Sequence, residues 1–207
     1  MPGKPTAIDR LPPIPPERLT QAQRVAAQAI IDGPRGALYG PFVPLIRSPE
    51  LMECAQRMGE YLRYRSAIGL RLSELAILVT ARQWDQQVEW AIHAPIAEAE
   101  GVAPDTIAAI AAGRRPGAMP DDEALVHDFC VELHRAKRVA EPTYQAALAR
   151  FGEQGVVDLM GLNGYYTFLA MVMNAAQSAA PPSAAAPLPD INAAMCGSVQ
   201  MDAPPPG

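Results

Sequence analysis

The spacing of apolar residues along the middle of this chain allows one class of fold. Between about residues 17 and 178, apolar side chains recur at intervals of three and four, and runs that alternate polar with β-branched residues are absent. Intervals of three and four place side chains on one face of an α-helix, whereas a half-buried strand needs an interval of two. The sequence therefore predicts an all-α domain whose helices pack into a compact bundle.

Proline divides the chain into three parts. The sequence has 207 residues and 22 prolines, of which six lie in residues 1–16 and seven in residues 181–207. The middle has ordinary composition and is long enough to bury a core of its own. We expect a proline-rich arm over residues 1–16, a helical domain over 17–178 and a flexible Ala/Pro-rich tail over 179–207. An alternative is that apolar residues of the tail dock on a neighbouring subunit: Ile191, Met195 and Val199.

Charge and cysteine content exclude several classes of protein. Asp and Glu outnumber Lys and Arg by 22 to 17, and no segment concentrates basic residues as binding to a nucleic-acid backbone requires. The amino terminus lacks the continuous apolar segment of a signal peptide, and the longest apolar stretch, residues 165–176, is shorter than the roughly 20 residues that span a bilayer. The three cysteines form no Cys-x-x-Cys pair. We therefore expect a cytoplasmic protein with reduced thiols, no nucleic-acid partner and no membrane span.

Capping residues and helix breakers divide the domain into helices. Thr20 can cap a first helix, which Gly33 and Pro34 end, and Ser48 and Pro49 begin another after the apolar segment GPFVPL, a loop or short turn. The expected helices cover about residues 21–31, 49–66, 72–83, 85–100, 106–112, 121–138, 142–151 and 154–177. The second of them should expose a charged face made of Glu53, Arg57, Glu60 and Arg63.

Two consecutive helices carry the residues best suited to chemistry. Gln86, Glu89 and His93 fall within an arc of roughly 100° on one helix, where Glu89 and His93 are one turn apart. Glu74 lies near the start of the preceding helix, and a tight connection near Trp84 would bring its carboxylate toward His93. A glutamate that holds one imidazole nitrogen fixes the tautomer and leaves the other nitrogen for proton transfer near neutral pH. The residues alone also fit an ordinary solvated ion pair.

The same residues carry a resemblance to a known family. The chain resembles the carboxymuconolactone decarboxylase family, which is related to the alkylhydroperoxidase D-type proteins. Redox members of that superfamily have the pattern Glu-x11-Cys-x2-Cys-x3-His, and Glu74, Gln86, Glu89 and His93 have the same spacing. Both outer residues match, both cysteines are replaced, and a looser likeness covers about residues 41–174. The matching segments are Ser73–Leu78, Glu89–His93, and Ala97 with Gly101.

The resemblance implies a fold, an assembly and a reaction. It implies the helical bundle of the alkylhydroperoxidase D type, whose members assemble as homotrimers or homohexamers. Peroxide reduction needs a thiolate and a resolving thiol, which Gln86 and Glu89 cannot supply. The resemblance therefore implies a lyase, specifically a decarboxylase, or an isomerase that needs no cofactor or metal. Its substrate would be a small acidic molecule from aromatic-compound catabolism, such as the carboxylated lactone 4-carboxymuconolactone.

The resemblance also assigns roles to residues. His93 would be the proton donor, Glu74 its orienting partner, and Glu89 a second acid or base. Arg65 and Arg71 are alternatives for the cation that a substrate carboxylate requires. Three further residues are expected in the substrate site: Trp90, Gln86 and, as the nearest cation in the sequence, Arg82.

Other functions remain open. A thiol-dependent oxidoreductase of the same superfamily would need Cys54 or Cys130 at the site, and a non-catalytic oligomeric binding protein would bind a ligand without turnover. His127 and His134 share one helix face and suggest a metal site, but no further ligand lies at a suitable spacing. His134 is explained more simply by its place at the carboxyl end of a helix, where a cation is favoured.

Overall fold

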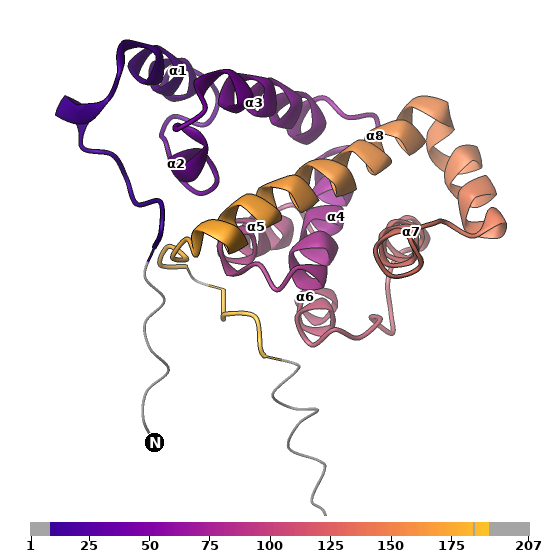
Figure 1. The fold of residues 1–207 in the computed structure, drawn as a ribbon. Coiled ribbons are helices and arrows are strands. Elements are labelled where there is room, and N and C mark those ends of the chain that lie inside the picture. Colours follow the sequence, from indigo (N-terminus) through magenta and orange to yellow (C-terminus); the bar gives the residue numbers. More distant parts are fainter. Residues whose placement is uncertain (1–8, 184, 191–207) are drawn as a thin grey trace, which may run out of the picture.

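The computed structural model describes residues 9–183 and 185–190, and every regular element in this part of the chain is a helix (Figure 1). The all-α class is therefore confirmed. The elements are a 3₁₀-helix, η1 (Pro16–Arg18), and the α-helices α1 (Gln21–Ile31), α2 (Phe42–Leu45), α3 (Pro49–Tyr64), α4 (Leu70–Gln83), α5 (Gln87–Ala99), α6 (Pro104–Ala111), α7 (Asp121–Ala136) and α8 (Glu141–Ala176).

Local signals set several helix boundaries. At the start of α1, the Gln23 backbone N–H donates to Thr20 Oγ1 at 3.2 Å, and the Thr20 N–H donates to the Gln23 side chain at 2.9 Å. This reciprocal capping box satisfies two N–H groups that the first turn leaves unpaired. Within α8, Gly152 has φ 69° and ψ 177°, so the element consists of two helical segments, as the sequence predicts.

Helix α4 forms the centre of the fold. It contacts α3, α5, α6, α7 and α8, and all its residues from Leu72 to Arg82 are buried. In Figure 1, α8 crosses the middle of the molecule, with α1–α3 on one side and α4–α7 on the other. Its apolar side chains meet those of α4 in the core, where the fully buried members include Leu75, Ile77, Leu78, Leu159, Leu162 and Met173.

Helix α8 is long and apolar enough to cross a bilayer by length and composition alone, with a mean hydropathy of 1.3 over an 18-residue window. However, 56% of that window is buried inside the molecule. The central helix of a water-soluble core meets the same criterion. The expectation that the chain has no membrane span stays a prediction.

The segment that precedes η1 lies along the end of α8. The Arg10 backbone N–H donates to Ala176 O at 2.8 Å, and the Arg10 guanidinium donates to Ala175 O at 3.1 Å. Arg47 holds the same segment through bonds to the Leu11 and Pro12 carbonyls, at 3.3 and 2.7 Å. The proline-rich arm thus packs on the domain over its described residues.

Part of the tail contacts the helical domain, and the expected flexibility of residues 179–207 stays a prediction. Ser183 and residues 185–190, here called the C-terminal strap, lie over α5. Ser183 Oγ donates to Ala91 O at 2.6 Å, and Leu188 exchanges two hydrogen bonds of 3.0 Å with the Gln87 side chain. The side chains of Gln87 and Trp90 on α5 satisfy backbone groups of the strap, and Leu188 is buried in the core with 5% of its surface exposed. Ile191, Met195 and Val199 lie outside the described residues.

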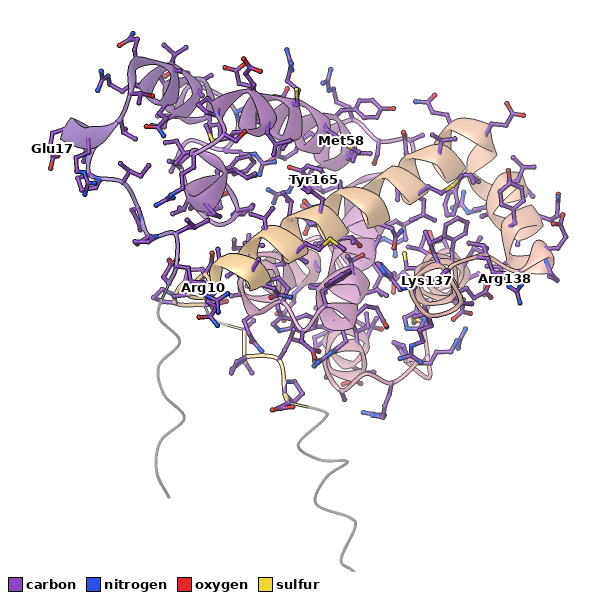
Figure 2. The ribbon with its side chains drawn as sticks, viewed as in Figure 1. Arg10, Glu17, Met58, Lys137, Arg138 and Tyr165 are labelled. Carbon is purple, nitrogen blue, oxygen red and sulfur yellow. The ribbon has the colours of Figure 1, made fainter. Side chains whose placement is uncertain are left out.

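Gly59 permits the close approach of α3 to α8, where Tyr165 lies between the two helices (Figure 2). A Cβ at position 59 would lie 2.2 Å from Tyr165 Oη. We expect Gly59→Ala to lower the free energy of unfolding by about 1–3 kcal/mol, because such a contact forces the helices apart. Denaturant unfolding would measure this change.

Gly164→Ala is the matched control for this prediction. Gly164 is also helical, but a Cβ there meets no atom within 4 Å. We expect this substitution to stabilise the protein by about 0.5–1 kcal/mol, because alanine favours the helix. Equal effects of the two substitutions would contradict the close packing at Gly59.

Candidate functional site

Four buried charged side chains form a continuous cluster between α3, α4 and α5. Arg63 Nε donates to Glu74 Oε1 at 3.1 Å, and Glu74 Oε2 lies 2.6 Å from His93 Nδ1. His93 Nε2 lies 3.2 Å from Glu89 Oε2. No member is more than 8% exposed. The expected contacts of His93 with Glu74 and Glu89 are confirmed, and we call the four residues the Arg63–Glu74–His93–Glu89 cluster.

The connection from α4 to α5 positions the two glutamates around His93. Trp84 ends α4, and Asp85 adopts a left-handed conformation with φ 51°, which turns the chain back. Gln86 then caps α5, because its side-chain oxygen accepts a hydrogen bond from Val88 N at 2.6 Å. Glu89 and His93 follow one turn apart on α5, and His93 lies between Glu89 and the side chain of Glu74 from α4.

The cluster is electrically balanced when His93 is protonated. Burial by itself would lower the pKa of His93, but the carboxylates of Glu74 and Glu89 outweigh it and raise that pKa to about 9. Burial would likewise raise the pKa of Glu74, yet His93 and Arg63 hold it below its usual value. Two cations facing two carboxylates compensate one another, as buried charges require. At neutral pH, His93 is therefore an acid with both nitrogens engaged, rather than a base with one free nitrogen.

A small cavity adjoins the cluster. Its volume is about 10 Å³, which is room for about one water molecule. One wall belongs to the segment 35–42, in which Gly36 and Gly40 have φ values of 68° and 58°. The cavity is lined by Arg35, Tyr39, Pro41, Phe42, Arg63, Glu89, Ile92, His93, Tyr166 and Leu169.

Several polar atoms at or beside this cavity are buried without a hydrogen-bond partner among the described residues. They are Glu89 Oε1, Tyr165 Oη, and Nε and Nη2 of Arg35. The Arg35 guanidinium lies 4.6 Å from the centre of the Phe42 ring. Buried donors and acceptors in native proteins almost always have partners, so such a group of exceptions indicates a place where a ligand binds. The donors of Arg35 and Tyr165 suit an anionic oxygen.

Sequence reasoning missed the two arginines of this site. Arg63 was expected on the exposed face of its helix, but the structure buries it against Glu74. A signal for this was present: Gly59 lies one turn before Arg63 on the same helix face, and a glycine there indicates close packing. Arg35 lies in an irregular segment between α1 and α2, where periodicity gives no information.

The structure does not bring Gln86, Trp90 or Arg82 to this cavity. Gln86 is a helix cap and donates to Asn174 Oδ1 at 2.7 Å instead of sharing the helix face of Glu89. Trp90 Nε1 donates to Ala186 O of the C-terminal strap at 3.1 Å. Arg82 lies eight residues after Glu74, about 12 Å further along α4. The alternative cations are also elsewhere: Arg65 is near Glu60, and Arg71 pairs with Asp122 and Glu123.

The two described thiols, Cys54 and Cys130, and the other histidines lie outside this cavity. Cys54 is exposed and Cys130 is buried, and burial raises the pKa of the Cys130 thiol to about 12. His134 Nε2 lies 3.2 Å from Thr80 Oγ1, and His127 pairs with Asp128 at 3.0 Å. Among the residues that the structure describes, no group of three or more His, Cys, Asp and Glu side chains is arranged to hold a metal ion.

The raised pKa of His93 predicts how stability depends on pH. A free imidazole titrates near 6.5, so the stability contributed by protonated His93 is complete below that pH and is lost as the pH rises through about 9. The contribution of ionised Glu74 is present above about 4.5 and is lost as the pH falls. We therefore expect the melting temperature to be highest between about pH 4.5 and pH 6.5, where both contributions are complete.

Nuclear magnetic resonance of the imidazole rings would test the same pKa. Of the three histidines in the chain, His93 should titrate near pH 9, and His134 below 6.5 because burial disfavours its charged form. The late titration should be absent from His93→Asn. A His93 ring that titrates at or below 6.5 would contradict the cluster.

Comparisons with known proteins do not identify a family or a function for this chain. No family model matches the chain, and no curated protein and no solved structure is similar to it.

Proposed function

We propose that this protein is a cofactor-independent lyase or isomerase of the carboxymuconolactone decarboxylase type, acting on a small carboxylated lactone such as 4-carboxymuconolactone. The observation that supports the proposal most strongly is the buried Arg63–Glu74–His93–Glu89 cluster, in which two carboxylates hold an imidazolium next to unpartnered donors. Among the described residues, buried Glu89 Oε1 of this cluster has no hydrogen-bond partner, and a bound ligand would supply one.

The decarboxylation divides into two events. Loss of carbon dioxide breaks the bond between the carboxyl group and the ring, and the electron pair of that bond moves into the unsaturated lactone as a dienolate. The guanidinium of Arg35 and the hydroxyl of Tyr165 would stabilise the negative oxygen that develops there. His93 then delivers its proton from Nε2 to a ring carbon, and solvent returns a proton to His93 through Glu89.

Glu74 acts on the substrate only through His93. Its bond to Nδ1 fixes the ring and keeps the imidazole protonated, which makes Glu74 a positioning residue. In the isomerase version of the reaction, Glu89 takes a proton from one carbon and His93 delivers one to another. Both versions use the same residues, and neither requires an electron acceptor.

Substrate entry requires the wall of the cavity to move. A space of about 10 Å³ does not hold a lactone. Most of the wall belongs to core helices, but the segment 35–42 is irregular until α2 begins at Phe42. Gly36 and Gly40 permit backbone changes within it that other residues resist. We infer that this segment moves aside to admit substrate.

We also propose that the protein is a homotrimer or homohexamer. Large apolar side chains are exposed on α3 and α8, and such residues favour an interface between copies. They are Leu51, Met58 and Tyr64 on α3, and Val157, Met160 and Met171 on α8. Sedimentation of the full chain tests this proposal, and a monomer at micromolar concentration contradicts it.

A substrate screen tests the proposed activity. Purified protein is mixed with carboxylated lactones and related unsaturated acids, and both ultraviolet absorbance and carbon dioxide are followed. We expect at least one lactone to lose its absorbance and to release carbon dioxide in equal amount. Binding by calorimetry without turnover would favour a binding protein, and thiol-dependent consumption of peroxide would favour an oxidoreductase; either result would overturn the proposal.

A further inference from the structure

A second cavity lies at the opposite end of α4 from Glu74. Its volume is about 230 Å³, and its walls come from the ends of α4, α6 and α7 and from the loop that joins α6 to α7. It shares no lining residue with the cavity at His93. The proton-transfer reaction proposed above makes no use of it.

Arginine dominates the polar lining of this second cavity. The four arginines there are a large share of the 17 basic residues in a chain whose net charge is −5. Arg115 is neutralised by two hydrogen bonds to Asp128, at 2.8 and 2.7 Å. Arg82 is paired with Asp85, and the negative charge of Asp190 also acts on it. Arg114 and Arg135 have no ion-pair partner in the part of the chain that the structure describes. Arg114 and Arg135 are therefore the two guanidinium groups at this cavity that no described carboxylate pairs with.

Arg82 provides an independent indication that a ligand binds here. Its side chain is only 3% exposed, and Nη1 donates to the carbonyls of Ala111 and Pro189 at 3.0 and 2.8 Å. Its Nε–H, in contrast, is buried and has no acceptor among the described residues. An unsatisfied buried donor is costly, and an anion in the cavity would provide the missing acceptor.

We propose that this cavity is a binding site for a small organic phosphate, with the phosphate dianion held by Arg114, Arg135 and Arg82 Nε–H. The two unpaired guanidinium groups suit the dianion of a phosphate monoester, and its several oxygens suit donors that approach from α4, from α7 and from the loop that joins α6 to α7. Val79, Ile110 and Val131 provide an apolar wall for a short organic group. The volume is slightly below the usual range for drug-sized ligands, so the organic part is small.

Calorimetry with phenyl phosphate tests the site in the full chain. At constant ionic strength, we expect one phenyl phosphate to bind per chain. Benzenesulfonate has a similar shape but one negative charge, and malonate has two charges but no phosphate; both should bind at least tenfold more weakly. No binding of phenyl phosphate, or equal binding of either competitor, would overturn the proposal.

Variants that remove the same amount of charge distinguish binding in the cavity from attraction by the net charge of the protein. Arg114→Gln combined with Arg135→Gln should weaken phenyl phosphate binding at least tenfold. The control, Arg57→Gln combined with Arg138→Gln, removes two exposed arginines that do not line the cavity and should leave the affinity within twofold; Arg138 lies just beyond α7 (Figure 2). Equal losses in the two double variants would show that only net charge matters and would contradict the site.

A third variant tests whether the two cavities are separate. Glu89→Gln changes the His93 cavity without altering the arginines of the second cavity. We expect it to bind phenyl phosphate as the wild type does, whatever its effect on lactone turnover. Loss of phenyl phosphate binding in Glu89→Gln would place the ligand at the His93 site and overturn the inference.

Discussion

Replacing His93 by asparagine is expected to lower kcat of the proposed lactone reaction by about 10²–10⁴-fold, the usual contribution of a positioned acid. Asparagine can still hydrogen-bond to Glu74, but it has no proton to deliver to carbon. KM should change less, because Arg35 and Tyr165 are the proposed contacts of the lactone oxygen. Initial rates of absorbance loss measure both constants. An unchanged kcat would contradict the assignment, and His134→Asn, outside the cavity, should stay within about twofold of the wild type.

The shape of the pH profile separates positioning by Glu74 from a purely structural role. In the wild type, kcat should fall as the pH rises through about 9, where His93 loses its proton. Glu74→Gln keeps a hydrogen bond to the ring but removes the negative charge, so this limb of the profile should move toward 6.5. A lower rate with an unmoved profile would indicate that Glu74 only supports the fold.

The second large effect concerns stability. Glu74→Ala is expected to lower the free energy of unfolding by about 3–5 kcal/mol, because it leaves Arg63 and His93 as buried cations with too few partners. Denaturant unfolding at pH 6, where His93 is charged, measures the loss. Arg63→Met combined with Glu74→Met should recover most of it, because a matched pair of charges is then replaced by apolar side chains of similar length.

An exposed ion pair is the control for this measurement. Glu60 and Arg65 approach to 4.0 Å with side chains 35% and 63% exposed. Glu60→Ala should therefore change the free energy of unfolding by less than about 1 kcal/mol. If Glu74→Ala lowers the free energy of unfolding no more than Glu60→Ala does, the claim that the cluster is buried is contradicted.

The fold was predictable where local chemistry decides it. The bounds of α1 agree with the prediction because Thr20 caps the helix and Gly33 with Pro34 ends it, and the break at Gly152 follows from the freedom of glycine. The predicted start of α5 was two residues too early. Asp85 adopts a left-handed conformation and Gln86 caps the helix, and neither residue type interrupts the helical spacing of the sequence. The strap was missed because its partners belong to α5, far away in the sequence.

Only the site residues on the hairpin of α4 and α5 could be predicted from the sequence. Glu74, Glu89 and His93 are brought together by two consecutive helices, so their spacing was sufficient. Arg63 and Arg35 reach the same place from α3 and from the preceding irregular segment, and only the packing of α2 and α3 against α8 decides that. Arg82 was predicted as a substrate contact because it is the nearest cation in the sequence. On a helix, however, separation in sequence becomes distance along the helix axis, so a nearby residue need not reach the same site.

The cluster also limits how this sequence can change over generations. Each of its four charges compensates a neighbour, so losing one alone would consume a large part of the 5–15 or so kcal/mol that keeps a typical domain folded. Lineages would therefore tend to lose Arg63 together with Glu74, or His93 together with a glutamate, and seldom one at a time. Among descendants of this sequence, these positions should covary as charge pairs whether or not the proposed reaction is kept.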